Sequence, residues 1–168
     1  MKRTLLIFSV VLSVLSIAPA RPAFASGTWT WPVSGPVVRA FDPPGTPYGS
    51  GHRGIDIAAP VGTVVRAPAA GVVTFAGSVG GRLFVTIDHG GGLLSTCSFL
   101  SALVVHGGDV VVQGQDIALS GTGHAGDTAP NVHLGVRFAG QYVDPMDYLA
   151  PMSIVGLIRL APIVSSSG

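Results

Sequence analysis

The sequence contains no glutamate, one lysine and one cysteine, and charged residues make up only 10% of it. Without glutamate, a catalytic base of the H-E-x-x-H kind is excluded, and carboxylate chemistry depends on aspartate alone. The single cysteine, Cys97, lies in an apolar run and can form no internal disulfide, so we expect it to be a small buried hydrophobe. Long patterns with helical periodicity are also missing, which favours a β-rich fold.

The first 25 residues have the features of a signal peptide. Lys2 and Arg3 precede an apolar run from Leu5 to Ala18, and Ala23-Phe24-Ala25 supplies a small-x-small cleavage pattern. The apolar run is shorter than the ~20 residues that span a bilayer, although an uncleaved membrane anchor is the alternative. We expect a protein that is secreted or resides in the cell envelope, with no stable membrane span after cleavage.

Cleavage would change the net charge of the protein. Residues 26–168 contain six arginines and eight aspartates, a net charge of −2, whereas the full chain has +1. No basic patch of the kind that binds nucleic acid or an anionic membrane is expected. Because Lys2 is the only lysine, the exported part has no lysine to which a cofactor could be attached. This excludes a biotinyl or lipoyl carrier domain, a class whose β-architecture is related to the one expected for this chain.

Glycine and proline divide the remaining ~143 residues into short apolar segments, a pattern typical of one all-β sandwich or barrel. The glycine clusters at 77–81 and 90–92 predict hairpin turns, and residues 121–130 predict a loop. We expect one β domain at 26–149 and an apolar tail at 150–168. The expected strands are Val37–Phe41, Ile55–Ala58, Thr63–Ala67, Gly71–Ala76, Leu83–Asp88, Leu93–Phe99, Asp109–Val112, Asp116–Ser120, Val132–Phe138 and Gln141–Val143.

His52 and Asp56 stand four residues apart in the segment "HRGID". On an extended strand this spacing is ~13 Å, too far for two atoms to bind one ion at ~2 Å. The two side chains can converge only if the backbone turns, which the flanking Gly51 and Gly54 would allow. Taken alone, the pair predicts either two metal ligands or a polar loop pair.

Residues 49–77, "GSGHRGIDIAAPVGTVVRAPAAGVVTFAG", resemble the lysostaphin-type (LytM-like) zinc endopeptidases, whose core often begins H-x-G-x-D-[IL]-A-A-P-x-G-T. Three further stretches resemble that family in the same order: "VTIDHGGG" at 85–92, "VVVQGQDIALSGTG" at 110–123 and "GQYVDPMDYL" at 140–149. The resemblance covers about residues 35 to 149. It implies a two-layer antiparallel β-sandwich of the barrel-sandwich (duplicated hybrid motif) type.

The same resemblance implies a site for one zinc ion. In that family the ligands are the histidine and aspartate of H-x-x-x-D and the second histidine of a later H-x-H, which correspond to His52, Asp56 and His133. Three protein ligands with an open fourth position are typical of catalytic zinc. The alternative is a fold that keeps these residues but binds metal weakly.

Two positions depart from the family pattern. The family handles protons with the first histidine of H-x-H and with a histidine in a segment resembling Y-A-H-L-S, and here Asn131 and Phe99 occupy those places. Asparagine cannot hold a proton near neutral pH, and phenylalanine can neither donate nor accept one. Leu134 and Gly135 also replace the phenylalanine and glutamate that usually follow H-x-H, so we expect less packing at Gly135.

Two other groups could replace the missing proton carriers. His124 lies in the loop before the strand, nine residues from His133, and could swing toward the metal, and Asp127 belongs to the same loop. Loop groups are poorly pre-organised, so this is the weaker hypothesis. His89, at a hairpin turn, and His106, in a solvated turn, are expected to take no part in the chemistry.

The sequence therefore supports two functions. One is an active zinc endopeptidase that cuts peptidoglycan cross-links with a rearranged base such as His124. The other is an exported relative with weak or no hydrolysis that binds wall peptides or regulates a cell-wall hydrolase. Each proton-transfer group contributes roughly 10²–10⁴ to a rate, so the loss of both favours the second.

Overall fold

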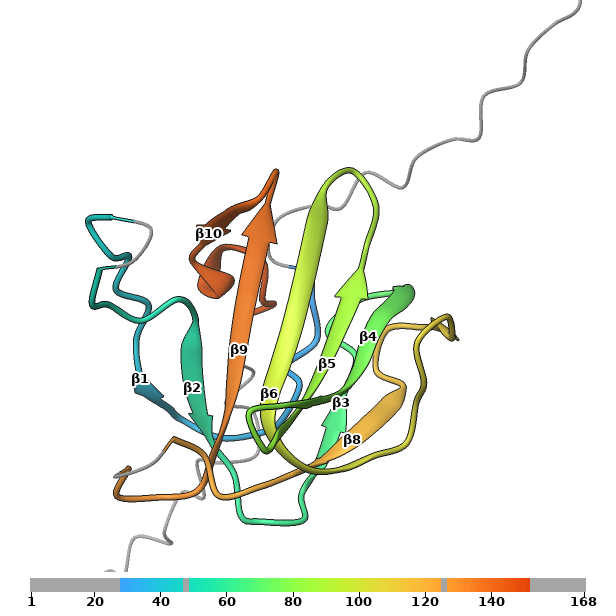
Figure 1. The fold of residues 1–168 in the computed structure, drawn as a ribbon, viewed down its shortest axis with the longest axis horizontal. Helices are drawn as coiled ribbons and strands as arrows, with labels where there is room; N and C mark the ends of the chain where they lie inside the picture. Colours follow the sequence, from blue (N-terminus) through green and yellow to red (C-terminus); the bar gives the residue numbers. More distant parts are fainter. Residues whose placement is uncertain (1–27, 47–48, 125–126, 152–168) are drawn as a thin grey trace, which may run out of the picture.

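The computed structural model describes residues 28–46, 49–124 and 127–151. The predicted signal peptide and most of the predicted tail lie outside these residues. The described chain forms ten strands and one 3₁₀ turn at Pro145–Asp147 (Figure 1), which confirms the all-β prediction. No helix in these three ranges has the length and hydropathy of a membrane span.

Every pair of strands is antiparallel. The strands are β1 Val37–Arg39, β2 Ile55–Ala58, β3 Val64–Arg66, β4 Gly71–Val79, β5 Arg82–Asp88, β6 Leu93–Leu103, β7 Val110–Val111, β8 Asp116–Ser120, β9 Asn131–Phe138 and β10 Gln141–Val143. Seven of them follow the order β1-β2-β9-β6-β5-β4-β7, while β10 pairs with β9, and β8 pairs with both β6 and β3.

Strand β6 joins the two layers of the sandwich because it changes partner along its length. Up to Ser98 it pairs with β9, and from Leu100 onward it pairs with β8 across a register shift. Phe99, at the change of partner, has a φ of 62°, which is uncommon for a residue other than glycine. The sequence predicted that this strand ends at Phe99, but it turns there and continues to Leu103.

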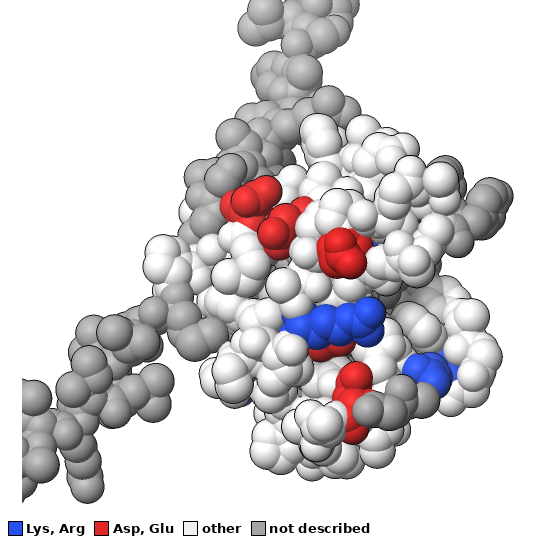
Figure 2. Space-filling model, turned by 90° about the vertical axis from the view of Figure 1, so that its left-hand side faces the viewer, with Lys and Arg blue, Asp and Glu red and all other residues white. Residues whose placement is uncertain are grey.

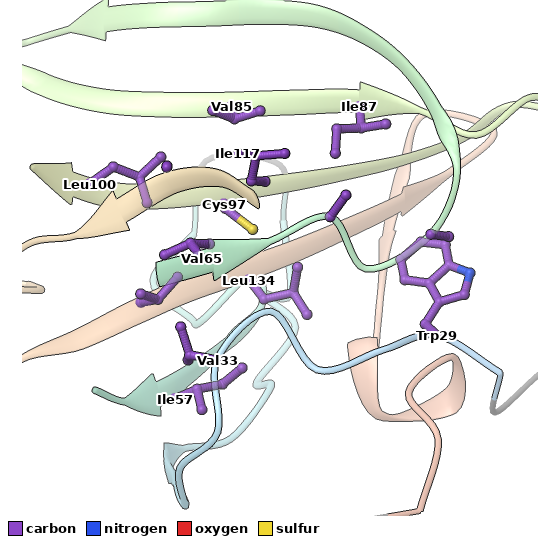
Figure 3. Packing of buried hydrophobic residues seen from close by; sticks show 14 of the residues in the cluster. Trp29, Val33, Ile57, Val65, Val85, Ile87, Cys97, Leu100, Ile117 and Leu134 are labelled. Atoms are coloured by element: carbon purple, nitrogen blue, oxygen red, sulfur yellow. The ribbon is translucent and has the colours of Figure 1, made fainter. Parts of the chain in front are cut away.

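The hydrophobic core follows the two-residue period of the strands. In β9, Val132, Leu134 and Val136 are fully buried, whereas His133 faces the opposite side of the sheet. Figure 3 shows Leu134 and Cys97 among the side chains of the buried cluster. Cys97 is 1% exposed and burial raises the pKa of its thiol to about 12, so the prediction of a buried hydrophobe is confirmed.

Glycine marks the turns, although one turn is shorter than predicted. The β4–β5 hairpin turns at Gly80 and Gly81, which both have positive φ as a two-residue turn requires. Gly77 belongs to β4 instead of the turn.

On the β1 and β2 side of the molecule, Figure 2 shows acidic and basic side chains interspersed with uncharged surface.

Candidate metal centre

The register of three strands aligns polar side chains on the face of the sheet opposite the core. Asp56 of β2 pairs directly with His133 of β9, and His133 pairs with Ser98 of β6. Directly opposed residues in an antiparallel sheet have Cβ atoms about 5 Å apart. The register therefore brings Asp56 and His133 together, although they are far apart in the sequence.

His52 precedes β2 and is held by its backbone and by its ring. Its backbone pairs with that of Asp42, and its Nδ1 donates a hydrogen bond of 2.7 Å to the carbonyl oxygen of Ala40. Because a carbonyl can only accept, this bond fixes the tautomer and leaves Nε2 with a free lone pair. The Nε2 atom points toward Asp56.

The three predicted ligands converge. His52 Nε2 lies 3.1 Å from Asp56 Oδ1, His133 Nδ1 lies 2.7 Å from the same oxygen, and the two ring nitrogens are 3.0 Å apart. A tetrahedral ion with bonds of about 2.0–2.1 Å separates its ligand atoms by about 3.3 Å. The donor types and their spacing fit a zinc ion.

The electrostatics of Asp56 also suit a cation. Its side chain is 1% exposed, and its second oxygen, Oδ2, is buried without a hydrogen-bond partner in the described residues. Burial alone would raise the pKa of Asp56, but a hydrogen bond from His133 and the nearby imidazoles of His133, His52 and His124 bring it below its usual value. A buried carboxylate in this state is costly unless a positive charge compensates for it.

Gly54 makes the approach of β2 to β9 possible. A Cβ at this position would lie 2.2 Å from the carbonyl oxygen of Leu134 and 2.7 Å from His133 Nε2. Any side chain would therefore displace either the strand or the imidazole. The role predicted for this glycine in bringing His52 and Asp56 together extends to His133.

A fourth side chain, His124, completes the cluster. Its Nε2 lies 3.4 Å from Asp56 Oδ1, and one ligand atom from each of the four residues lies within 4.8 Å of the others. Burial lowers the pKa of His124, although the charge of Asp56 opposes this, so the ring is neutral at neutral pH. Sequence reasoning named His124 only as a loop residue that could move, whereas it already lies beside the other three.

Asp127 does not reach this cluster. Its Oδ2 accepts hydrogen bonds from Asn131 Nδ2 at 2.7 Å and from the backbone nitrogen of His124 at 3.1 Å. Asn131 is fully buried and also donates to the carbonyl oxygen of Ala129. Asp127 and Asn131 therefore connect the loop that carries His124 to the first residue of β9.

Phe99 covers the cluster from the side of β6. Its ring centroid lies 4.1 Å from that of His124 and 6.2 Å from that of His133. The guanidinium of Arg82 lies 4.8 Å from the centroid of the same ring. The side chain that replaces a family histidine is thus in direct contact with His124.

The cluster lies in a groove of about 650 Å³. Arg39, Arg53 and Arg137 line the groove together with the aromatic rings of Phe75 and Phe84. Sequence reasoning missed these arginines, although the two-residue period places Arg137 on the same face of β9 as His133. Gly135 is also a lining residue, and a Cβ there would meet the carbonyl oxygen of Arg53 at 3.2 Å, so this position is tighter than predicted.

The remaining histidines lie outside the cluster. His89 is buried, with Nδ1 donating to the carbonyl oxygen of Ala70 at 2.8 Å and Nε2 2.8 Å from Ser95 Oγ. Burial lowers the pKa of His89. His106 is 91% exposed, as expected of a solvated turn residue.

Several known bacterial proteins are similar in sequence to this chain. The chain is 34% identical to the Mycobacterium tuberculosis protein Rv2891 over 97% of its own length and 67% of that protein. It is 34% identical to the Escherichia coli murein hydrolase activator NlpD, over 73% of its own length but only 31% of that protein. The chain spans 31% to 50% of the length of three bacterial lipoproteins that it also matches.

A solved structure that contains zinc shares the fold. The zinc-containing peptidase from Vibrio cholerae superposes with a TM-score of 0.59 at 26% identity, covering 75% of this chain and 41% of that one. The model of peptidase family M23 matches residues 50–145, which include all four residues of the cluster and more than half of the chain. The chain therefore belongs to peptidase family M23.

Proposed function

We propose that this protein acts in the cell envelope as a zinc-binding, peptidase-like domain that recognises peptidoglycan peptides or a wall hydrolase without efficient hydrolysis of its own. His52, Asp56 and His133 would hold one zinc ion. The fit of the donor atoms and the similarity to a zinc-containing peptidase support this assignment. With an open fourth position, a bound zinc ion would act as a Lewis acid on a carbonyl oxygen in the groove, whereas with four protein ligands it would stabilise the site alone.

The observation that carries the proposal is the absence of a proton carrier at the two positions where the family places histidines. Phe99 has no titratable group, and Asn131 is fully buried with its amide donated to Asp127. The other charged groups that line the groove are arginines, whose guanidinium groups donate hydrogen bonds and have no atom that accepts a proton. Peptide hydrolysis would therefore be slow even with zinc bound.

The groove suits a peptide that carries carboxylates. Arg39, Arg53 and Arg137 line a surface that also exposes aromatic rings, and guanidinium groups bind carboxylates in a paired, planar geometry. Tyr142 lies within 6.0 Å of the guanidinium of Arg53 and 5.7 Å of that of Arg137, which holds both side chains near one ring. We infer that the groove binds an acidic peptide segment.

The relatives favour a regulatory role in the envelope. One of them is named a murein hydrolase activator, and others are named lipoproteins. Together with the predicted signal peptide, these names support export and a cell-wall hydrolase as the partner. The domain would then use an inactive peptidase groove as a binding surface.

The test is release of dye from labelled peptidoglycan, measured with the purified chain alone, with a wall hydrolase alone, and with both. We expect no release by the chain alone and faster release when both are present. Replacing Arg137 with glutamine should reduce the stimulation, whereas replacing the distant, exposed His106 with alanine should not. Rapid release by the chain alone would refute the proposal.

A second candidate function is active hydrolysis with His124 as the base. The observation that favours it is the position of His124, whose Nε2 lies 3.4 Å from Asp56 Oδ1 at the edge of the cluster. In that case the chain alone would release dye, and His124→Ala would abolish the release. If neither the wild-type chain nor the His124→Ala variant releases dye, this candidate is eliminated.

A further inference from the structure

The position of His124 differs from that of a loop residue near an open metal site. Its Nε2 is buried, has no hydrogen-bond partner among the described residues, and lies 3.4 Å from Asp56 Oδ1. That separation is close to the ~3.3 Å expected between two ligands of one tetrahedral zinc ion. The ring centroids of His52 and His133 lie 5.8 Å and 5.4 Å from that of His124, and one ligand atom from each of the three imidazoles and the Asp56 carboxylate lies within 4.8 Å of the others.

Phe99 holds the His124 ring from one side. The two centroids are 4.1 Å apart with the planes tilted by 51°, a close aromatic contact. Phe99 adopts a φ of 62°, in a left-handed region that is unfavourable for an aromatic residue. The surrounding structure thus maintains a strained backbone that places the phenylalanine ring against His124.

Asn131 holds His124 through the loop backbone. Its amide donates to Asp127 Oδ2, and the same oxygen accepts from the backbone nitrogen of His124. Gly123 packs directly on the Asn131 side chain, because a Cβ there would lie 2.6 Å from Asn131 Nδ2, and its φ of 84° also favours glycine. The two residues that replace the family's catalytic histidines therefore both contact or anchor the residue that points at the metal position.

We propose that His124 is a fourth protein ligand of the zinc ion, positioned by Phe99 and Asn131. The inference rests on the zinc site proposed above and deepens it. Four protein ligands are typical of structural zinc, whereas catalytic zinc keeps one position open. The site is thus a closed centre with three imidazole nitrogens and one carboxylate oxygen, and the groove above it is left for binding.

X-ray absorption of the zinc-loaded wild-type chain tests the ligand count directly. We expect scattering from three imidazoles and one carboxylate, and a cobalt-substituted protein with the intense visible absorption of a four-coordinate tetrahedral ion. Scattering from only two imidazoles would overturn the assignment of His124 while leaving the zinc site intact. A wild-type chain that binds neither zinc nor cobalt would overturn both proposals.

Substitutions provide the second measurement. Competition with a chromophoric chelator should show that His124→Ala weakens zinc binding by at least about tenfold, and that Phe99→Leu and Asn131→Ala each weaken it by about 10–100-fold, as losses of supporting residues do. Each of these variants should also change the cobalt spectrum, which a purely structural role would not require. His106→Ala is the matched control and should change neither property.

Circular dichroism confirms that each variant is folded, and His124→Gln serves as a less disruptive replacement if the alanine variant unfolds. Equal zinc affinity and an unchanged cobalt spectrum in the folded His124 variant would refute the inference.

Discussion

Opening the closed centre and restoring both proton carriers should create hydrolytic activity. The perturbation is the triple substitution Phe99→His, Asn131→His and His124→Ala. The first two place imidazoles where the family has them, and the third removes the fourth side chain from the cluster. The double substitution that keeps His124 is the matched comparison.

The structure favours a histidine at residue 99 more than at residue 131. The φ of 62° at residue 99 favours histidine over phenylalanine, because histidine is enriched in the left-handed region. At residue 131 space is tight, since a Cβ on Gly123 would already meet the Asn131 amide. A histidine there needs more room beside Gly123, and removing the His124 imidazole from the same loop eases that fit.

The expected gain follows from the chemistry that is missing. A positioned proton carrier contributes roughly 10²–10⁴ to a rate, and two carriers that act as a unit do not add independently. The triple variant should therefore release peptide fragments at least about a hundredfold faster than the wild type. The double variant should gain less, because His124 still occupies a coordination position.

The assay is release of new amino groups from purified peptidoglycan with zinc present, over a series of pH values. Metal content is measured in parallel, so that a loss of zinc is not mistaken for a loss of chemistry. A triple variant that binds zinc, is folded and shows no gain would refute the account of the missing carriers. A double variant as fast as the triple would refute the account of the closed centre.

Three further predictions concern the scaffold. Because burial raises the pKa of Cys97 to about 12, its thiol should resist alkylation in the native protein and react fully in denaturant, as followed by mass spectrometry. Gly54→Ala should lower the free energy of unfolding by about 1–3 kcal/mol in urea titrations and weaken zinc binding, because its Cβ would overlap the Leu134 carbonyl oxygen. Burial lowers the pKa of His89, although its hydrogen bond to Ala70 and the charge of Asp88 oppose this, so at acidic pH the unfolded chain binds a proton at this residue more readily than the folded chain does. The free energy of unfolding should therefore fall as the pH drops below about 6.5. In urea titrations at several pH values, with a chelator present to remove metal, His89→Gln should reduce this fall.

The strands were predictable where the alternation of apolar residues and the flanking glycine or proline residues indicate the same bounds. Ile55–Ala58, Asp116–Ser120 and Gln141–Val143 have the predicted bounds, since proline or glycine lies close to an end of each. The end of β6 was wrong because its change of direction occurs at Phe99, a residue type that gives no turn signal. There the packing of the ring, and not local propensity, determines the backbone.

The metal cluster was predictable only in part. The spacing of residues in the sequence does not predict that His133 lies beside Asp56. The family resemblance predicted it, and in the structure the register between β2 and β9 pairs the two residues. His124 lies in a loop without periodicity, so its direction depends on Asp127, Asn131 and Phe99 together. No local pattern in the sequence encodes a position that three separate contacts determine.

Those contacts bear on what the two replacements mean. A site that had merely lost its proton carriers would need no particular side chains at positions 99 and 131, and small residues would serve. Here one replacement packs its ring on His124 despite an unfavourable φ, and the other is fully buried and anchors the same loop. Both replacements therefore position the same imidazole, that of His124, which faces Asp56. The two replacements and the proposed fourth ligand are therefore better explained as one change, from a site that would expose a metal to one that would enclose it.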